Sequence, residues 1–173
     1  RWYYDSDLCR RLAHDRALRI NTADAYAKFA WLERELANLD LPASLPKGIC
    51  HCDFHFSNVL FQGDEFAALI DFDDANHTYL QFDLVGLIEY HAWPHTADYL
   101  DLEPASKVVQ EYMSHRPLPE IEQFYLYDVY KLSILIDCVW FFRRGSAADF
   151  REKRKIDFLN SLGRQLCMEA IFA

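Results

Sequence analysis

The sequence predicts an α+β domain that is mostly α-helical and carries one small β-hairpin near its middle. Apolar residues recur at helical spacing over residues 22–39, and again through the second half of the chain. Between these helical regions, two short apolar runs at residues 59–61 and 66–70 flank Gly63, which is typical of a hairpin with a tight turn. We therefore expect residues 1–173 to fold as a single domain.

Composition and charge argue against several classes of protein. With 173 residues, of which 51% are apolar and 16% aromatic, the chain can bury a sizeable core. The net charge of -9 argues against nucleic acid as a partner, because binding phosphates requires Lys and Arg. No apolar run approaches the roughly 20 residues of a membrane span, and no signal peptide opens the chain. The five scattered cysteines suit a reducing compartment, so we expect a cytoplasmic protein with no membrane partner.

Two helices are predicted before the hairpin. Residues 5–19 carry leucines near helical spacing. Residues 22–39 form a stronger candidate, because Asn21 or Thr22 can cap the helix and five apolar residues line one face. The stretch 41–48, which contains two prolines, then breaks the helical pattern.

Two helices are also predicted for the last third of the chain. Pro119 stands at the first turn of a long helix that reaches Arg144, and Gly145 follows just past its end. A final helix is expected over residues 147–171. Helices thus account for most of the predicted structure.

Polar side chains flank the predicted hairpin on both sides. Asp53 and Asn58 precede it, and Asp71 follows it. Because a hairpin returns the chain to its starting side, Asn58 and Asp71 should lie close together, with Asp53 within reach. Two carboxylates about 4 Å apart repel by roughly 4 kcal/mol at an effective dielectric near 20, so we expect a cation between them. Oxygen ligands suit Mg²⁺, which usually completes its shell with substrate phosphates, and this predicts phosphoryl transfer.

Two motifs around the hairpin resemble those of a known family. The segment HCDFHFSN, residues 51–58, resembles the His-Gly-Asp-x-x-x-x-Asn catalytic loop of the aminoglycoside phosphotransferase and homoserine kinase family, relatives of the protein kinases. The segment LIDFDDA, residues 69–75, resembles the metal-binding segment of that family. The motifs cover residues 48–90. The resemblance implies a protein-kinase-like C-terminal lobe whose small β-hairpin carries the catalytic and metal-binding loops.

The resemblance implies a role for each matched residue. Asp53 would be the catalytic base that orients the acceptor hydroxyl. Asn58 and Asp71 would be ligands of Mg²⁺, with ATP as the co-substrate. Asp83 would brace the catalytic loop through backbone N–H groups, and His51 would pack beneath that loop.

Further candidates follow from the same resemblance. Candidate metal or substrate contacts are Asp73, Asp74 and His55, and candidate acceptor-binding residues are Glu89, Tyr90 and Trp93. The acceptor would be a small-molecule hydroxyl compound, and the excess of acidic residues favours one that bears an amine. Homoserine is the first acceptor that the resemblance suggests, followed by choline-like compounds and aminoglycosides.

The chain departs from the family pattern in two respects. Cys52 stands where the family has Gly beside the catalytic Asp, and a positive φ there would cost roughly 1 kcal/mol. No Gly-rich phosphate loop followed by a strand Lys is present. The chain also begins at Arg1 rather than Met. We therefore expect a fragment whose N-terminal nucleotide lobe, a partner in the same full-length protein, is absent, and which alone is a poor catalyst.

Several alternatives stay open at this stage. The cysteines and histidines of residues 50–55 could bind zinc, although their spacing is poor, or act in redox chemistry. A metal-dependent hydrolase built on His51 and Asp53 would need further ligands, for which His77, His91 and His95 are loose candidates. A catalytically silent kinase-like module that binds a ligand or partner is the main competitor. The aromatic stretches 124–127 and 139–142 could form core or a cage for a cation.

Overall fold

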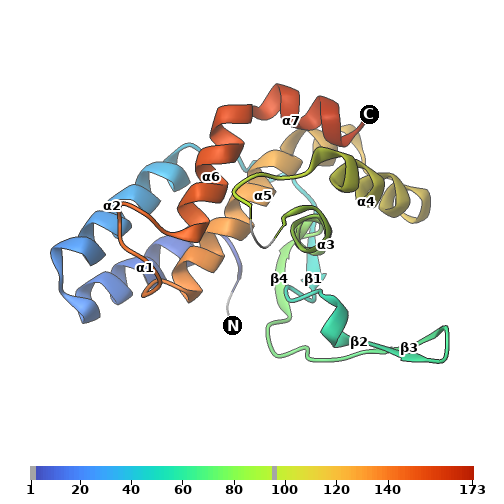
Figure 1. Cartoon of the computed structure of the whole chain (residues 1–173), viewed down its shortest axis with the longest axis horizontal. Helices are drawn as coiled ribbons and strands as arrows, with labels where there is room; N and C mark the ends of the chain where they lie inside the picture. The colour runs from blue at the N-terminus through green and yellow to red at the C-terminus, as the bar shows by residue number, and fades with distance from the viewer. Residues whose placement is uncertain (1–2, 95–96) are drawn as a thin grey trace.

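The computed structural model describes residues 3–94 and 97–173, which fold into a helical body with two small antiparallel sheets (Figure 1). The helices are α1 (Ser6–Ile20), α2 (Ala23–Ala37), α3 (Phe82–Ala92), α4 (Leu102–His115), α5 (Glu120–Trp140), α6 (Arg151–Leu162) and α7 (Arg164–Ile171). The strands are β1 (Lys47–Cys50), β2 (Val59–Gln62), β3 (Glu65–Leu69) and β4 (Asn76–Tyr79), and a short 3₁₀ helix spans Phe56–Asn58. This mostly helical α+β architecture confirms the predicted fold class.

The predicted hairpin is formed by β2 and β3. The strands pair antiparallel, with Val59 opposite Leu69 and Gln62 opposite Glu65. Gly63 has a φ of 63°, a left-handed conformation that glycine adopts without strain, so it allows the tight turn. The hairpin extends away from the helical body in Figure 1. Because its two strands run antiparallel, residues 58 and 70 lie next to each other at its base.

A second sheet, formed by β1 and β4, was not predicted from the sequence. Lys47 pairs with Tyr79, and Cys50 pairs with Asn76. The sheet holds residue 51, where the segment after β1 begins, close to residue 75, where the segment after β3 ends. Each strand has only four residues and its partner lies far along the chain, so no local pattern identifies it.

Helix α5 forms the centre of the helical body. It crosses the middle of that body in Figure 1, and Tyr130, Leu132, Ile134 and Leu135 on it are fully buried. Because apolar residues occupy nearly all sides of a helix in such a position, its sequence shows no narrow apolar stripe. No helix in the described ranges is both long and apolar enough to cross a membrane.

The predicted ends of the last helices were partly wrong. Helix α5 ends at Trp140 rather than Arg144, because Lys28 donates hydrogen bonds to the carbonyls of Phe142, Arg144 and Gly145 and fixes a turn there. The expected final helix is two helices, α6 and α7. Gly163 separates them with a φ of 77° and a ψ of 155°, which no helix can contain.

Candidate active site

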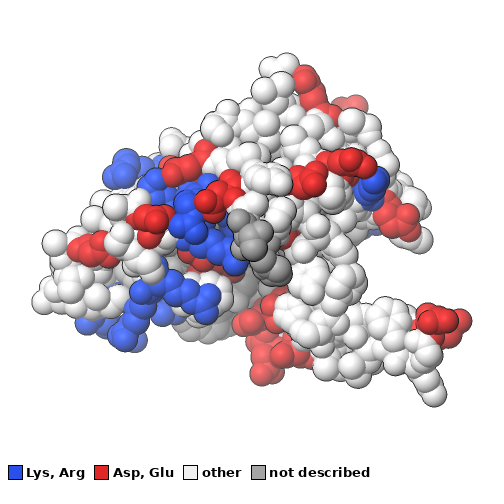
Figure 2. Space-filling view, in the orientation of Figure 1, with Lys and Arg blue, Asp and Glu red and all other residues white. Residues whose placement is uncertain are grey.

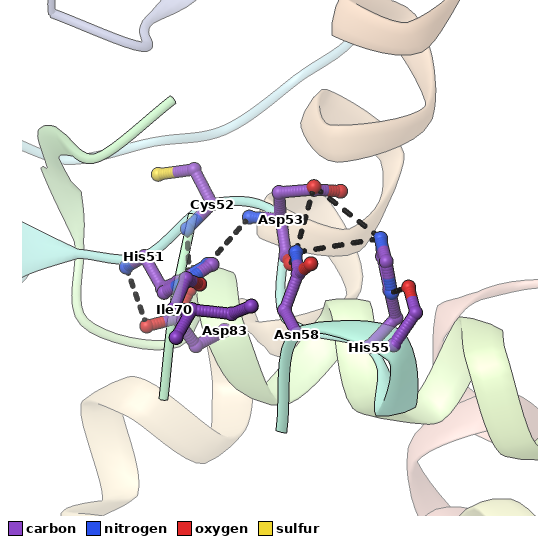
Figure 3. A network of polar contacts seen from close by, with 8 residues as sticks. His51, Cys52, Asp53, His55, Asn58, Ile70 and Asp83 are labelled. Atoms are coloured by element: carbon purple, nitrogen blue, oxygen red, sulfur yellow. Dashed lines mark hydrogen bonds and ion pairs between the residues drawn. The ribbon is translucent and has the colours of Figure 1, made fainter. Parts of the chain in front are cut away.

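The loop between β1 and the 3₁₀ helix, residues 51–58, is held in place by Asp83. This residue lies in the first turn of α3, and its carboxylate accepts hydrogen bonds from the backbone N–H groups of His51 (2.9 Å) and Cys52 (2.8 Å) (Figure 3). Charge-assisted bonds of this kind are stronger than bonds between neutral groups. The loop backbone is therefore fixed from beneath by one side chain.

His51 joins this loop to the segment that precedes Asp71. The imidazole is buried, its Nε2 lies 2.8 Å from the carbonyl oxygen of Ile70, and its Nδ1 accepts from the N–H of Asp53 at 3.3 Å. We assign the neutral tautomer with the proton on Nε2, since that form satisfies both contacts. Both ring nitrogens are thus used by the backbone.

These contacts bear on the zinc and hydrolase alternatives. With both nitrogens of His51 occupied, the ring has no lone pair left for a metal. His77 and His91 pack against the rings of Tyr3 and Phe56, and His95 lies outside the described residues. Within residues 3–94 and 97–173, no group of three or more His, Cys, Asp or Glu residues could hold a metal ion. The histidines thus give these alternatives no support.

Asp53 and Asn58 are in direct contact. The buried Asn58 amide donates from Nδ2 to the carboxylate Oδ2 of Asp53 (3.0 Å) and to the backbone oxygen of the same residue (2.9 Å). His55 Nε2 lies 3.3 Å from that Oδ2, and His55 Nδ1 is hydrogen-bonded to Ser57 Oγ at 2.7 Å. Within the described part of the chain, Oδ1 of Asp53 and Oδ1 of Asn58 accept no hydrogen bond. One oxygen on each side chain is therefore available to a ligand.

Asp71 directly follows Ile70, the residue whose backbone is hydrogen-bonded to Asn58 at the base of the hairpin. The N–H of Ile70 donates to the backbone oxygen of Asn58 at 2.9 Å, which places the next residue, Asp71, at the loop. Asp71 is exposed and has a φ of 62°, in the left-handed region that non-glycine residues rarely occupy. This hydrogen bond brings together the backbone segments that carry Asn58 and Asp71, while the proximity of their side chains stays a prediction.

Asp73 and Asp74 add further negative charge in the connection from β3 to β4. The pKa of Asp74 is raised, first by partial burial and then by the carboxylates of Asp53, Asp71 and Asp73. Figure 2 shows acidic side chains gathered beside the hairpin, where Figure 1 places this connection. Such repulsion is relieved by a cation, and a set of carboxylate and amide oxygens fits Mg²⁺.

Cys52 adopts the strained backbone that its position in the motif implied. Its φ is 65°, so a residue with a side chain occupies a conformation that favours glycine. Burial, followed by the carboxylate of Asp83, raises the pKa of the Cys52 thiol well above its ordinary value. A thiol that stays protonated is a poor nucleophile, which argues against redox chemistry at this site.

A cleft of about 490 Å³ opens beside the loop of residues 51–58, and Asp53, His55 and Asp74 line this side of it. Its second wall is one face of α3, where the residues recur at helical spacing: Phe82, Gly86, Glu89, Tyr90 and Trp93. All three acceptor candidates, Glu89, Tyr90 and Trp93, are therefore brought together at the cleft. The imidazole of His55 stacks on the ring of Tyr90, with 6.1 Å between the ring centres, and so joins the two walls.

The third wall is one face of α5, which sequence reasoning missed. Ser133, Ile136, Asp137 and Trp140 line it, and Arg151 lies at the start of α6. A signal was present in the sequence, because Asp137 is an acid within the otherwise apolar run from Ile134 to Phe142. The sequence left open whether the aromatic stretch 139–142 forms core or lines a binding site. Trp140 and Phe141 line the cleft, while Phe142 is buried in the core.

Comparison with known proteins identifies the family. Residues 1–119, more than half of the chain, match the family described as "Phosphotransferase enzyme family". The chain belongs to this family. The match includes both motifs and the first two walls of the cleft, so the predicted family is confirmed.

Several curated relatives of this chain are homoserine kinases. That of Afipia carboxidovorans is 36% identical over 133 residues, which make up 75% of this chain and 36% of that protein. Those of Nitrobacter winogradskyi and Rhodopseudomonas palustris are 34% and 33% identical, with the same coverage. The chain thus spans about a third of the length of these relatives.

Family membership and fold together place the chain as a kinase-like C-terminal lobe. The comparisons do not assign a role to any single residue. The catalytic, metal-binding and bracing roles therefore stay predictions for Asp53, Asn58, Asp71, Asp83 and His51.

Proposed function

We propose that the full-length protein transfers the γ-phosphoryl group of ATP to the hydroxyl of a small amine-bearing acceptor, with homoserine as the first candidate. One observation carries the proposal: Asp53 lines the acceptor cleft while Asn58 holds one of its carboxylate oxygens at 3.0 Å. A carboxylate restrained in this way can present its other oxygen to a bound hydroxyl. The homoserine kinase names of the relatives support the choice of acceptor.

Asp53 is the proposed catalytic base. It accepts a hydrogen bond from the acceptor hydroxyl, aims the oxygen at the phosphorus atom and takes the proton as the new bond forms. Asn58 and His55 both contact Oδ2 of Asp53 and so limit its rotation. Asp83 and His51 act one step away, since they hold the loop backbone on which Asp53 stands.

Asn58 and Asp71 are the proposed Mg²⁺ ligands. The free Oδ1 of Asn58 and the exposed carboxylate of Asp71 are hard oxygen donors on two backbone segments that meet at the hydrogen bond between Ile70 and Asn58. Asp73 and Asp74 lie in the same acidic segment, where the charges of Asp71 and Asp73 raise the pKa of Asp74. When bound, Mg²⁺ would neutralise the charge on the transferred phosphate. Two protein ligands leave positions for phosphate oxygens and water, which is the usual composition of such a site.

We also propose that nucleotide binding requires an N-terminal lobe of the same full-length protein. The chain matches only 36% of the length of the homoserine kinases that it resembles, which supports this. Residues 1–173 alone should therefore be a poor catalyst, because the groups that would cover ATP are not among them. The cytoplasmic location remains an expectation from cysteine usage.

The Asp53→Ala variant of the full-length protein tests the catalytic role. Turnover of Mg-ATP and homoserine should fall by about 100-fold or more, since a positioned general base contributes roughly 10² to 10⁴ in rate. Product is followed as phosphorylated acceptor, and circular dichroism checks that the helical content is unchanged. Asp15→Ala, at an exposed position on α1, is the matched control and should keep full activity.

Two results would count against the proposal. Full activity of the Asp53→Ala protein would remove Asp53 from the mechanism. If the wild-type protein binds ATP but phosphorylates no member of a panel of homoserine, choline-like and aminoglycoside acceptors, a catalytically silent module is the better description.

A further inference from the structure

We propose that Asp137 on α5 binds the ammonium group of the acceptor and thereby selects amine-bearing alcohols over neutral ones. The inference rests on the proposed phosphotransferase function and deepens it by assigning the residue that reads the charge of the acceptor. Asp137 lines the same cleft as Asp53. A molecule whose hydroxyl meets Asp53 can therefore reach Asp137 with a second group.

The carboxyl group of Asp137 is left without a partner by the described residues. Within residues 3–94 and 97–173 its side chain forms neither a hydrogen bond nor an ion pair, although it is partly buried. The nearby Glu89 on α3 is already paired with Lys155 on α6. A carboxylate removed from water without a partner is costly, and an ammonium ligand would supply both the charge and the hydrogen bonds.

The charges around Asp137 come from every wall of the cleft. Glu89 on α3, Glu152 on α6 and Asp53 on the catalytic loop are acidic, and Lys155 on α6 is the opposing cation. Partial burial, followed by Glu89, raises the pKa of Asp137 well above its usual range. Among the described residues that line the cleft, Asp53, Asp74, Glu89 and Asp137 are acidic and Arg151 is basic, so negative charge remains in excess even though Lys155 pairs with Glu89, and the cleft favours a cation.

The aromatic lining fits the same ligand. Tyr90, Trp93 and Trp140 line the cleft with Asp137, and ring faces attract ammonium groups. Trp93 is buried, its indole N–H donates to the carbonyl of Ala97 at 3.1 Å, and Lys155 lies 5.5 Å from the centre of its ring. The more exposed rings of Tyr90 and Trp140 are therefore the ones that a ligand can reach.

The test compares two acceptors that differ only in the amine. Homoserine and 4-hydroxybutyrate carry the same hydroxyl and carboxylate, and only homoserine carries an ammonium group. In the full-length protein, Asp137→Asn should raise the KM for homoserine by about 10- to 100-fold, the range expected when a hydrogen bond between charged groups is lost. The kcat/KM for 4-hydroxybutyrate should stay unchanged.

Ser133→Ala is the matched control. Ser133 lies one turn before Asp137 on the same face of α5 and lines the same cleft, but it carries no charge. This variant should preserve the discrimination between the two acceptors. Equal losses for both acceptors in Asp137→Asn would assign Asp137 a purely structural role and overturn the inference. If the wild-type protein does not phosphorylate homoserine at all, the proposed function fails, and this inference fails with it.

A calorimetric measurement keeps the inference falsifiable if Asp137→Asn does not fold. Burial and the neighbouring acids raise the pKa of Asp137 in the empty cleft, and pairing with an ammonium group lowers it again, so binding of the amine should release protons to the buffer. Titration of the wild-type protein with homoserine, in buffers of different ionisation enthalpy, should detect this release. Titration with 4-hydroxybutyrate should release none, and the same release with both acceptors would contradict the assignment.

Discussion

Two residues of the candidate site hold a backbone conformation that favours glycine. Cys52 has a φ of 65° and precedes Asp53, while Asp71 has a φ of 62°. Strain of this kind costs about 1 to 3 kcal/mol per residue and persists only where the surroundings impose it. The bonds from Asp83 to the loop and from Ile70 to Asn58 are such constraints. The strained backbone that positions Asp53 and Asp71 therefore lowers the stability of the folded state somewhat.

Substitutions of Cys52 should separate backbone strain from side-chain packing. Cys52→Val should lower the free energy of unfolding by about 1 to 3 kcal/mol, because a β-branched residue is particularly unfavourable at positive φ. In Cys52→Gly the relief of strain opposes the loss of a small half-buried side chain, so the change should stay within about 1 kcal/mol. Urea unfolding of both variants measures the difference, and equal effects would show that strain at residue 52 is unimportant.

At the scale of the elements, the junction between α6 and α7 depends on one glycine. Gly163 has a φ of 77° and a ψ of 155°, a combination that is nearly exclusive to glycine. No atom lies within 4 Å of where a Cβ would stand, so a side chain would be strained by the backbone alone. The two-helix ending of the chain therefore rests on conformational freedom at this residue.

The same substitution at two glycines should have opposite effects. Gly163→Ala should lower the free energy of unfolding by about 1 to 3 kcal/mol. Gly86→Ala, in the middle of α3 and also with no atom within 4 Å of the new Cβ, should raise it by up to about 1 kcal/mol, because alanine favours a helix. Thermal or urea unfolding of the pair gives the answer. A stabilising Gly163→Ala would mean that α6 and α7 can merge.

Prediction from sequence succeeded where the signal is local. The motif around Asp53 and Asn58 and the turn at Gly63 lie within a few residues of each other, so local spacing was enough to predict the hairpin and to group these side chains near its base. The β1–β4 sheet was missed because its strands are short and distant in sequence. Asp137 was missed for a related reason: which face of α5 meets the cleft is decided by packing against α3. The break at Gly163 could have been suspected, since a glycine interrupts the helical pattern there.

At the scale of the whole molecule, buried thiols should make the free energy of unfolding fall as the pH rises through the alkaline range. All five cysteines are free, and burial raises the pKa of Cys138 and of Cys167 from 9.0 to about 12. Between these values the unfolded chain has released protons that the folded chain still holds. The folded state then binds more protons than the unfolded state, so stability must fall as the pH rises.

The expected loss is roughly 1 kcal/mol per thiol for each pH unit above about 9. Chemical denaturation of the full-length protein at a series of alkaline pH values measures it. The double variant Cys138→Ala, Cys167→Ala should show a shallower decline with pH. An unchanged slope in this variant would assign the alkaline sensitivity to other groups, such as the buried phenol of Tyr130.

Two walls of the cleft are single faces of α3 and α5. Asp53 is oriented separately, by Asn58 within the loop of residues 51–58 and by Asp83, which accepts hydrogen bonds from the backbone of that loop. Side chains such as those at positions 86, 137 and 140 can therefore be exchanged without moving the loop backbone that carries Asp53. An architecture of this kind lets the choice of alcohol drift during evolution while the reaction itself is retained. Re-engineering of acceptor preference should accordingly begin with these helical positions and leave the loop untouched.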